Sequence, residues 1–177
     1  VCLLCLYQPF MELWVGKDLM LSFSAVICFV VYFFVRQLNA LFNMYKDASG
    51  MWHEDRFRPL VAALTNLVLN LILVQFIGVY GILISTVVAI ICVGMPSLLH
   101  NLFTVIFERK HLLEYLKKLS FYFAVIFMSC IITYFICTKI KLGLLMTFLV
   151  RGIVCLIIPN LIYLIAYKSR MEFKDSL

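Results

Sequence analysis

The chain contains a long stretch, from Pro59 to Phe107, that carries no Asp, Glu, Lys or Arg. A helix needs about 20 apolar residues to cross a hydrocarbon layer roughly 30 Å thick. The stretch is interrupted only by the four residues Gly78–Gly81, so we interpret it as two membrane-spanning helices joined by a tight turn. A water-soluble helix would present a polar face to solvent, and this stretch has none.

Three further charge-poor runs are long enough to cross a membrane, namely Leu19–Tyr45, Ser120–Thr138 and Leu142–Tyr167. The hydrophobic fraction of 65% and the mean hydropathy of +1.07 lie far above the roughly 45–50% apolar content of globular proteins. The shorter run Val1–Phe10 resembles the end of a helix whose start is missing. The sequence therefore predicts an all-α transmembrane bundle with about five complete spans and one partial, N-terminal span.

We expect residues 1–177 to form one integral-membrane domain, the C-terminal fragment of a longer protein, with a polar cytoplasmic tail at 171–177. The net charge of +6 could suggest a nucleic-acid partner, but the basic residues lie in short loops between the predicted spans. The positive-inside rule explains that placement better. Ten basic residues on one side against three on the other predict a multi-pass protein of the cell membrane with a cytoplasmic C-terminus. The three are Lys17, Lys139 and Lys141, and the ten are Lys46, Arg56, Arg58, Arg109, Lys110, Lys117, Lys118, Lys168, Arg170 and Lys174.

The segment Glu108–Lys118, between two predicted spans, allows two interpretations. Its leucines recur at helical spacing among Lys and Glu, which is typical of a short amphipathic helix on the membrane surface. An ordinary basic loop explains the segment equally well.

All seven cysteines fall within apolar runs. The spacing Cys2-x-x-Cys5 occurs in redox and zinc motifs, but no second pair accompanies it. We interpret the cysteines as small apolar side chains that fill space, and we expect neither a metal nor a cofactor. Motifs of metalloproteases, phosphate-binding loops and nucleophile elbows are also missing, and no span holds paired carboxylates. The sequence therefore favours a transporter over an enzyme.

Polar residues inside the predicted spans form two groups. Arg36, Asn39, Asn43 and Asp47 recur at intervals of three, four and four residues, so they share one face toward the cytoplasmic end of their helix. They would either line a wet cavity or extend from a helix end into the headgroups. Arg151 lies about 10 Å into a span counted from Leu144, where an unpaired Arg costs at least ~2.5 kcal/mol. It would either contact a substrate or extend to the outer interface.

The charge-free hairpin has its own polar and small residues. Asn66 and Asn70 are one turn apart and would either hydrogen-bond between helices or contact a substrate. Gly81, Ser85 and Ala89 form a stripe of small residues after the Gly78 turn, which favours close helix packing. Pro96 predicts a kink in the second helix, and such a kink can act as a hinge.

Six short motifs occur in an order that resembles the C-terminal half of polysaccharide flippases, members of the multidrug/oligosaccharidyl-lipid/polysaccharide exporter superfamily. The resemblance covers about Phe10 to Thr104. The motifs are Phe10–Gly16, Tyr45–Gly50, Arg56–Leu60, Asn66–Asn70, Gly78–Ile82 and Ser85-Thr86.

This resemblance implies one lobe of a two-lobed transporter with a central cationic cavity and alternating access. The implied cargo is an undecaprenyl-pyrophosphate-linked oligosaccharide, and the implied partners are membrane lipid and an N-terminal lobe of the same protein. Arg36, Asn39, Asn43, Asn66, Asn70 and Arg151 are the candidates for its path.

Three other functions remain open. A multidrug exporter of the same fold would place an acidic residue in a span, and none occurs from Leu60 to Phe107. Part of a membrane glycan polymerase or ligase would carry a large outer loop, whereas the predicted outer loops are short. A scaffold without transport activity is the third.

Overall fold

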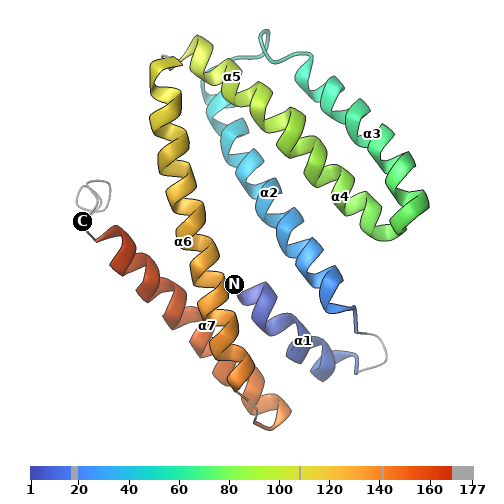
Figure 1. The fold of residues 1–177 in the computed structure, drawn as a ribbon, viewed down its shortest axis with the longest axis vertical. Coiled ribbons are helices and arrows are strands. Elements are labelled where there is room, and N and C mark those ends of the chain that lie inside the picture. Colours follow the sequence, from blue (N-terminus) through green and yellow to red (C-terminus); the bar gives the residue numbers. More distant parts are fainter. Residues whose placement is uncertain (17–19, 108, 141, 169–177) are drawn as a thin grey trace. The chain divides into compact units, whose positions relative to one another are not determined.

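The computed structural model describes residues 1–16, 20–107, 109–140 and 142–168, and all regular structure in these ranges is helical (Figure 1). The predicted all-α fold class is therefore confirmed. The predicted tail at 171–177 lies outside the described residues. The helices are α1 (Cys2–Trp14), α2 (Phe23–Ala48), α3 (Arg58–Ile77), α4 (Val79–Ala89), the π-helical turn η2 (Ile90–Gly94), α5 (Met95–Val105), the 3-10 turn η3 (Arg109–His111), α6 (Leu112–Lys139) and α7 (Leu144–Tyr167).

Five helical segments in the described ranges are long and apolar enough to cross a membrane, as the sequence predicts. They are α2, α3, the continuous segment Val79–Val105, the segment Arg109–Lys139, and α7. Large hydrophobic side chains on them are exposed, among them Phe76 at 80% and Ile165 at 74%. Soluble proteins rarely expose apolar surface so extensively, whereas lipid-facing helices do. The 13 residues of α1 extend only about 20 Å, which is shorter than a complete span.

The chain divides into two compact units, which we describe separately. Unit 1 combines Val1–Val26 with the residues from Tyr115 onward, and so contains α1, most of α6, and α7. Unit 2 is Ile27–Glu114 and contains most of α2 together with α3, α4 and α5.

In unit 2, α3 and α4 form the predicted hairpin and lie side by side (Figure 1). Gly78 ends α3 with φ of 57°, a backbone conformation that side chains other than that of Gly rarely adopt. A Cβ added to Gly81 would lie 2.6 Å from the backbone carbonyl carbon of Leu73, so only Gly permits this approach of the two helices. Ser85 and Ala89 are also buried, and the hydroxyl of Ser85 bonds Asn70 of α3, so Gly81 and Ser85 of the small-residue stripe lie against α3.

Pro96 lies in the first turn of α5, directly after η2. The N–H of Met95 donates to the carbonyl of Ile90, which is π-helical bonding. Because Pro has no N–H to donate, a local change of hydrogen-bond pattern next to it accommodates the residue inside a long helix. The bend predicted at Pro96 stays a prediction.

The segment Glu108–Lys118 differs from both interpretations drawn from the sequence. Glu108 lies outside the described residues, but residues 112–118 form the first two turns of α6. Residues 112–118 are therefore neither a separate surface helix nor a loop, and Arg109–His111 form the 3-10 turn before them. No Gly or Pro interrupts the chain from Leu112 to Lys139, and Glu114 lies in the first turn, where a carboxylate favours the positive end of the helix dipole.

Candidate functional site

One face of α2 in unit 2 carries an open pocket of about 650 Å³. All four polar residues predicted to share this face line the pocket, with small or flexible apolar side chains between them. The pocket thus combines one cation, one carboxylate and two amides on a helix that has the length and composition to cross a membrane. The lining residues are Arg36, Asn39, Ala40, Asn43, Met44, Asp47 and Ala48.

Arg36 is exposed, and its Nη1 donates to the hydroxyl of Tyr32 at 2.7 Å. The guanidinium carbon lies 5.9 Å from the centroid of the Tyr32 ring, within the range of a cation–π contact. Both contacts orient the guanidinium along the helix from one turn away. A guanidinium carries five N–H donors, so this bond leaves donors for an anion in the pocket.

Asn39 faces a tightly packed part of unit 2. Its Oδ1 is buried and has no hydrogen-bond partner, and it lies 3.7 Å from the place that a Cβ on Gly94 would occupy. Gly94 belongs to the π-helical turn η2, so α2 approaches this turn closely at Asn39. A buried amide oxygen without a partner is costly, and this oxygen faces the packed turn at Gly94 instead of the open pocket.

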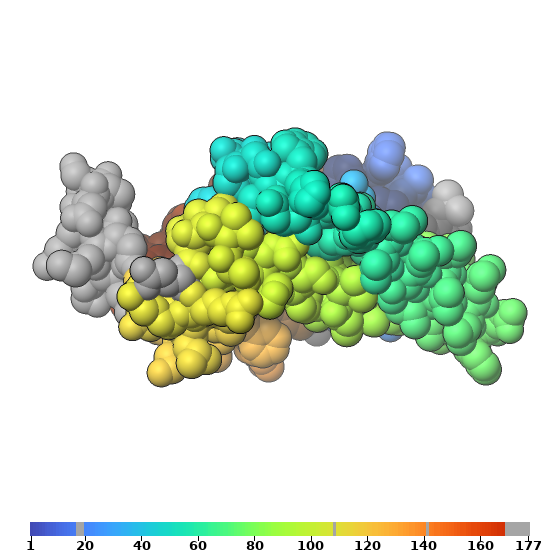
Figure 2. Space-filling model, turned by 90° about the horizontal axis from the view of Figure 1, so that it is seen from above, coloured from blue at the N-terminus to red at the C-terminus, as the bar shows by residue number. Residues whose placement is uncertain are grey.

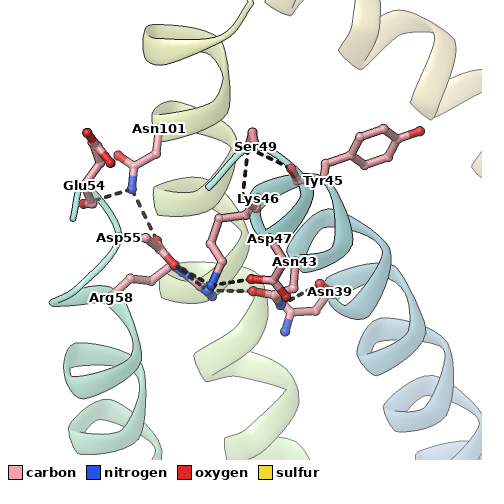
Figure 3. Close-up of polar contacts among 10 residues, drawn as sticks. All are labelled: Asn39, Asn43, Tyr45, Lys46, Asp47, Ser49, Glu54, Asp55, Arg58 and Asn101. Carbon is pink, nitrogen blue, oxygen red and sulfur yellow. Dashed lines mark hydrogen bonds and ion pairs between the residues drawn. The ribbon is translucent and has the colours of Figure 1, made fainter. Parts of the chain in front are cut away.

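A cluster of buried charges lies at the C-terminal end of α2, next to the pocket (Figure 3). Asp55 is 3% exposed, and the side chain of Arg58 is 9% exposed. The Nε of Arg58 lies 2.7 Å from Oδ1 of Asp55, and its Nη2 lies 2.7 Å from Oδ2. This two-pronged contact is the strong form of an Arg–carboxylate pair. It compensates two charges that would be costly to bury alone.

Arg58 also connects the cluster to the pocket. Its Nη2 donates to Oδ1 of Asn43 at 2.7 Å, and Nδ2 of Asn43 donates to the backbone carbonyl of Asn39 at 2.7 Å. Asn43 therefore lines the pocket with its amide held at both ends. The start of α3, which contains Arg58, thereby fixes the conformation of a pocket side chain on α2.

Two further residues complete the cluster. The Nζ of Lys46 lies 3.6 Å from Asp55 and 3.1 Å from Asp47, and 4.5 Å above the ring of Trp52. Asn101 of α5 donates to Oδ1 of Asp55 at 3.3 Å. Figure 2 shows the residues after α2, in cyan, beside the yellow-green end of α5. Lys46 and Arg58 together exceed Asp55 by one positive charge, which the half-exposed Asp47 beside Lys46 balances. The cluster joins α2, α3 and α5.

Residues at the end of α2 and at the start of α3 position this cluster. Gly50 has φ of 69° and donates its N–H to the carbonyl of Asp47 at 3.2 Å, while the hydroxyl of Ser49 donates to the carbonyls of Tyr45 and Lys46. These bonds satisfy carbonyls that a helix end leaves free, and α2 ends there. Pro59 is in the first turn of α3, where its missing N–H costs nothing.

Asn66 and Asn70 take part in hydrogen bonds between α3 and α4. The hydroxyl of Ser85 donates to Oδ1 of Asn70, and Nδ2 of Asn70 donates to Oδ1 of Asn66 at 3.3 Å. The hydroxyl of Thr86 lies 3.4 Å from the same oxygen of Asn66. Both amide oxygens are therefore used by the hairpin itself. The sequence left two roles open for these residues, hydrogen bonding between helices or contact with a substrate. The contacts described here are hydrogen bonds between helices.

Arg151 belongs to unit 1, whereas the other five candidate path residues belong to unit 2. Its Nη2 donates to the backbone carbonyl of Ile140 at 3.1 Å, just after the end of α6. Its Nε is buried and has no hydrogen-bond partner. The guanidinium is thus partly satisfied within the hairpin of α6 and α7.

Sequence reasoning missed Asp55, Arg58, Lys46 and Asn101 as a buried cluster and treated the charged ones as loop residues. One signal was present: Asp55 precedes Arg58 by three residues, and Pro59 marks the start of a helix. Asn101, 46 residues away from Asp55, gave no such signal, because only the tertiary structure brings it to the carboxylate.

Comparisons with protein families, curated proteins and solved structures gave no match to this chain. The class that the fold defines is a membrane-embedded helical protein, and the functional argument rests on the pocket of α2 and its neighbouring cluster.

Proposed function

We propose that this chain is the second lobe of a flippase in the cell membrane. Its cargo would be an undecaprenyl-pyrophosphate-linked oligosaccharide, moved from the cytoplasmic to the outer leaflet for cell-surface polysaccharide synthesis. The observation that carries the proposal is the polar pocket lined by Arg36, Asn39 and Asn43 on a membrane-spanning helix. Polar side chains inside membranes are costly, and they typically mark a water-filled path.

The chemistry of the pocket suits this cargo. A guanidinium binds diphosphate oxygens through paired hydrogen bonds, and Arg36 supplies one on the pocket wall. The amide of Asn43 uses one N–H and one oxygen lone pair within the protein, which leaves a second N–H and a second lone pair for a sugar hydroxyl. The resemblance of the motifs from Phe10 to Thr104 to polysaccharide flippases supports the same class of cargo.

The buried cluster supports a transport role because its Arg58 holds the amide of Asn43 on the pocket wall. Asp55 is the buried carboxylate of the described part of the chain, and Arg58 and Lys46 both pair with it. A multidrug exporter of this fold would need a carboxylate in a span that is available to a coupling ion. Asp55 lies between spans and is already paired. Asp47, in the last turn of α2, lines the pocket and pairs with Lys46, so the pocket carboxylate also lies at the end of its span and already has a partner.

Orientation follows from the distribution of basic residues. The end of α2 with Lys46, Arg56 and Arg58 would face the cytoplasm, together with the C-terminus. The pocket then opens near the cytoplasmic leaflet, where the cargo would be loaded. An N-terminal lobe of the same protein would supply the opposite wall.

Deletion of the gene in its own host tests the proposal. We expect surface polysaccharide to be lost and the lipid-linked oligosaccharide to accumulate in the cytoplasmic leaflet, with both effects reversed by the intact gene. Unchanged surface polysaccharide together with increased sensitivity to toxic compounds would instead indicate a multidrug exporter.

A further inference from the structure

Three cysteines from three different helices of unit 1 converge on one point. Cys5 comes from α1, Cys137 from α6 and Cys155 from α7, and their Sγ atoms all lie within 4.8 Å of one another. Each residue is at most 4% exposed. The three positions are far apart in the chain, so sequence reasoning treated them as separate apolar side chains.

We propose that these three thiols form a binding site for a single Cu(I) ion. Metal–thiolate bonds are about 2.3 Å long, so three sulfurs placed in a plane around one metal lie about 4.0 Å apart. The Sγ atoms of Cys137 and Cys155 are 3.9 Å apart. A disulfide needs about 2.05 Å, and all three cysteines are free thiols. The triangle of sulfurs therefore needs only small shifts to hold a three-coordinate metal.

The donor set selects the metal. Soft thiolates favour Cu(I), zinc and iron–sulfur clusters over magnesium and calcium. A zinc site usually has four ligands in a tetrahedron, and no fourth His, Cys, Asp or Glu joins this group among the described residues. The partly buried neighbours Val1, Leu6, Tyr134 and Val154 supply no further metal ligand, so the three-coordinate geometry is what favours Cu(I). Each thiol that becomes a ligand releases its proton to solvent, and copper remains Cu(I) throughout.

A buried hydroxyl on α6, one turn before Cys137, offers a donor for a thiolate. Thr133 lies one turn before Cys137, on the same face of α6, and is fully buried. Its hydroxyl has no hydrogen-bond partner in the described part of the chain, although such a group normally has one. The hydroxyl does not bond the thiol of Cys137 in this structure. Deprotonation of that thiol would give the hydroxyl a stronger acceptor one turn away, and donors of this kind stabilise metal-bound thiolates.

Cys2 offers a path of entry. It is exposed and lies three residues before Cys5, so the two thiols share one side of α1. A metal ion bound first at Cys2 can pass to Cys5 by exchange of one thiolate for another. The proposed site therefore joins a buried triangle to an accessible fourth thiol.

Copper retention by the purified complete chain tests the site. The background variant has Cys2, Cys28, Cys92 and Cys130 replaced by Ser. The reduced protein in detergent is incubated with Cu(I), which ascorbate keeps reduced, in the presence of a chelator that competes for Cu(I). We expect one copper per chain after desalting. Cys5→Ala, Cys137→Ala or Cys155→Ala should each lower retention at least tenfold. Restoring Cys130, a thiol of α6 outside the triangle, should leave it unchanged.

X-ray absorption at the copper edge, on the chain with all its cysteines, needs no substituted protein. The proposal predicts three sulfur neighbours at about 2.3 Å. Fewer sulfurs, or nitrogen and oxygen neighbours, would overturn it. Copper retention that no triangle substitution reduces would also overturn it and would leave the three cysteines as residues that fill space.

Discussion

Asp55 and Arg58 form a two-pronged ion pair in which Nε lies 2.7 Å from Oδ1 and Nη2 lies 2.7 Å from Oδ2. The two side chains are 2% and 9% exposed. Arg58 also holds the amide of Asn43, which lines the pocket. The pair thus connects the segment between α2 and α3 to the wall of the proposed cargo path.

Removal of either partner should destabilise the protein. A buried charge without its partner costs about 3 kcal/mol or more, so Asp55→Ala and Arg58→Ala should each lower the thermal unfolding midpoint of purified protein in detergent. The double variant should lose clearly less than the sum of the two, because it leaves neither charge behind. Arg56→Ala, at an exposed neighbour, should change stability by no more than about 0.5 kcal/mol. Strict additivity of the two single effects would contradict the coupling.

Backbone contact at Gly81 gives a second test. Ala at this position would place a Cβ 2.6–2.8 Å from backbone atoms of Leu73 and Val74, which cannot move aside cheaply. Gly81→Ala should therefore separate α3 from α4 and lower the unfolding midpoint. Gly152→Ala is the matched control, because nothing lies within 4 Å of its Cβ position. That change should be neutral or stabilise α7 by up to about 1 kcal/mol. Equal effects of the two substitutions would argue against close packing at Gly81.

Local patterns predicted much of the fold. Long apolar runs indicated the five spanning segments, and Gly78 marked the hairpin turn. These features depend on residues that are neighbours in the chain. The start of α6 was not predicted, because the charged residues within 114–118 are typical of a loop or of a helix on the membrane surface. The uninterrupted helical propensity of the segment decided the outcome.

The sites were harder to predict, because they depend on distant residues. The spacing of Arg36, Asn39 and Asn43 predicted a shared face, and the structure places all three on the pocket wall. No local pattern connects Asp55 to Asn101, or Cys5 to Cys155. These pairs meet only after helices far apart in the sequence have packed together.

The orientation of the chain can be measured with single cysteines, in a background without accessible native thiols. Ser49→Cys lies after α2, on the predicted cytoplasmic side, and Gly143→Cys lies between α6 and α7, on the predicted outer side. Both positions are exposed, so exposure does not distinguish them. In intact cells an impermeant thiol reagent should label the cysteine at 143 and spare the one at 49. The reverse pattern would invert the topology.

Arg151 distinguishes a cargo contact from a structural bond. If it binds diphosphate, Arg151→Ala in the full-length protein should abolish glycan export at unchanged abundance. Arg151→Lys should restore only part of it, since Lys lacks the planar fork. Asn160→Ala is the control on α7, because its side chain bonds the carbonyl of Leu156 within the same helix. Full export by the Lys variant would contradict a cargo contact and would leave Arg151 only the structural role of bonding the carbonyl of Ile140.

Surface glycan per molecule of full-length transporter, compared between Arg36→Ala and Gln37→Ala, tests the central claim most directly. Arg36 lines the pocket, whereas its exposed neighbour Gln37 does not. The account predicts that Arg36→Ala lowers export at least tenfold, with lipid-linked oligosaccharide retained in the cytoplasmic leaflet, and that Gln37→Ala exports normally. Normal export by Arg36→Ala at equal abundance would contradict a role of this pocket in cargo transport.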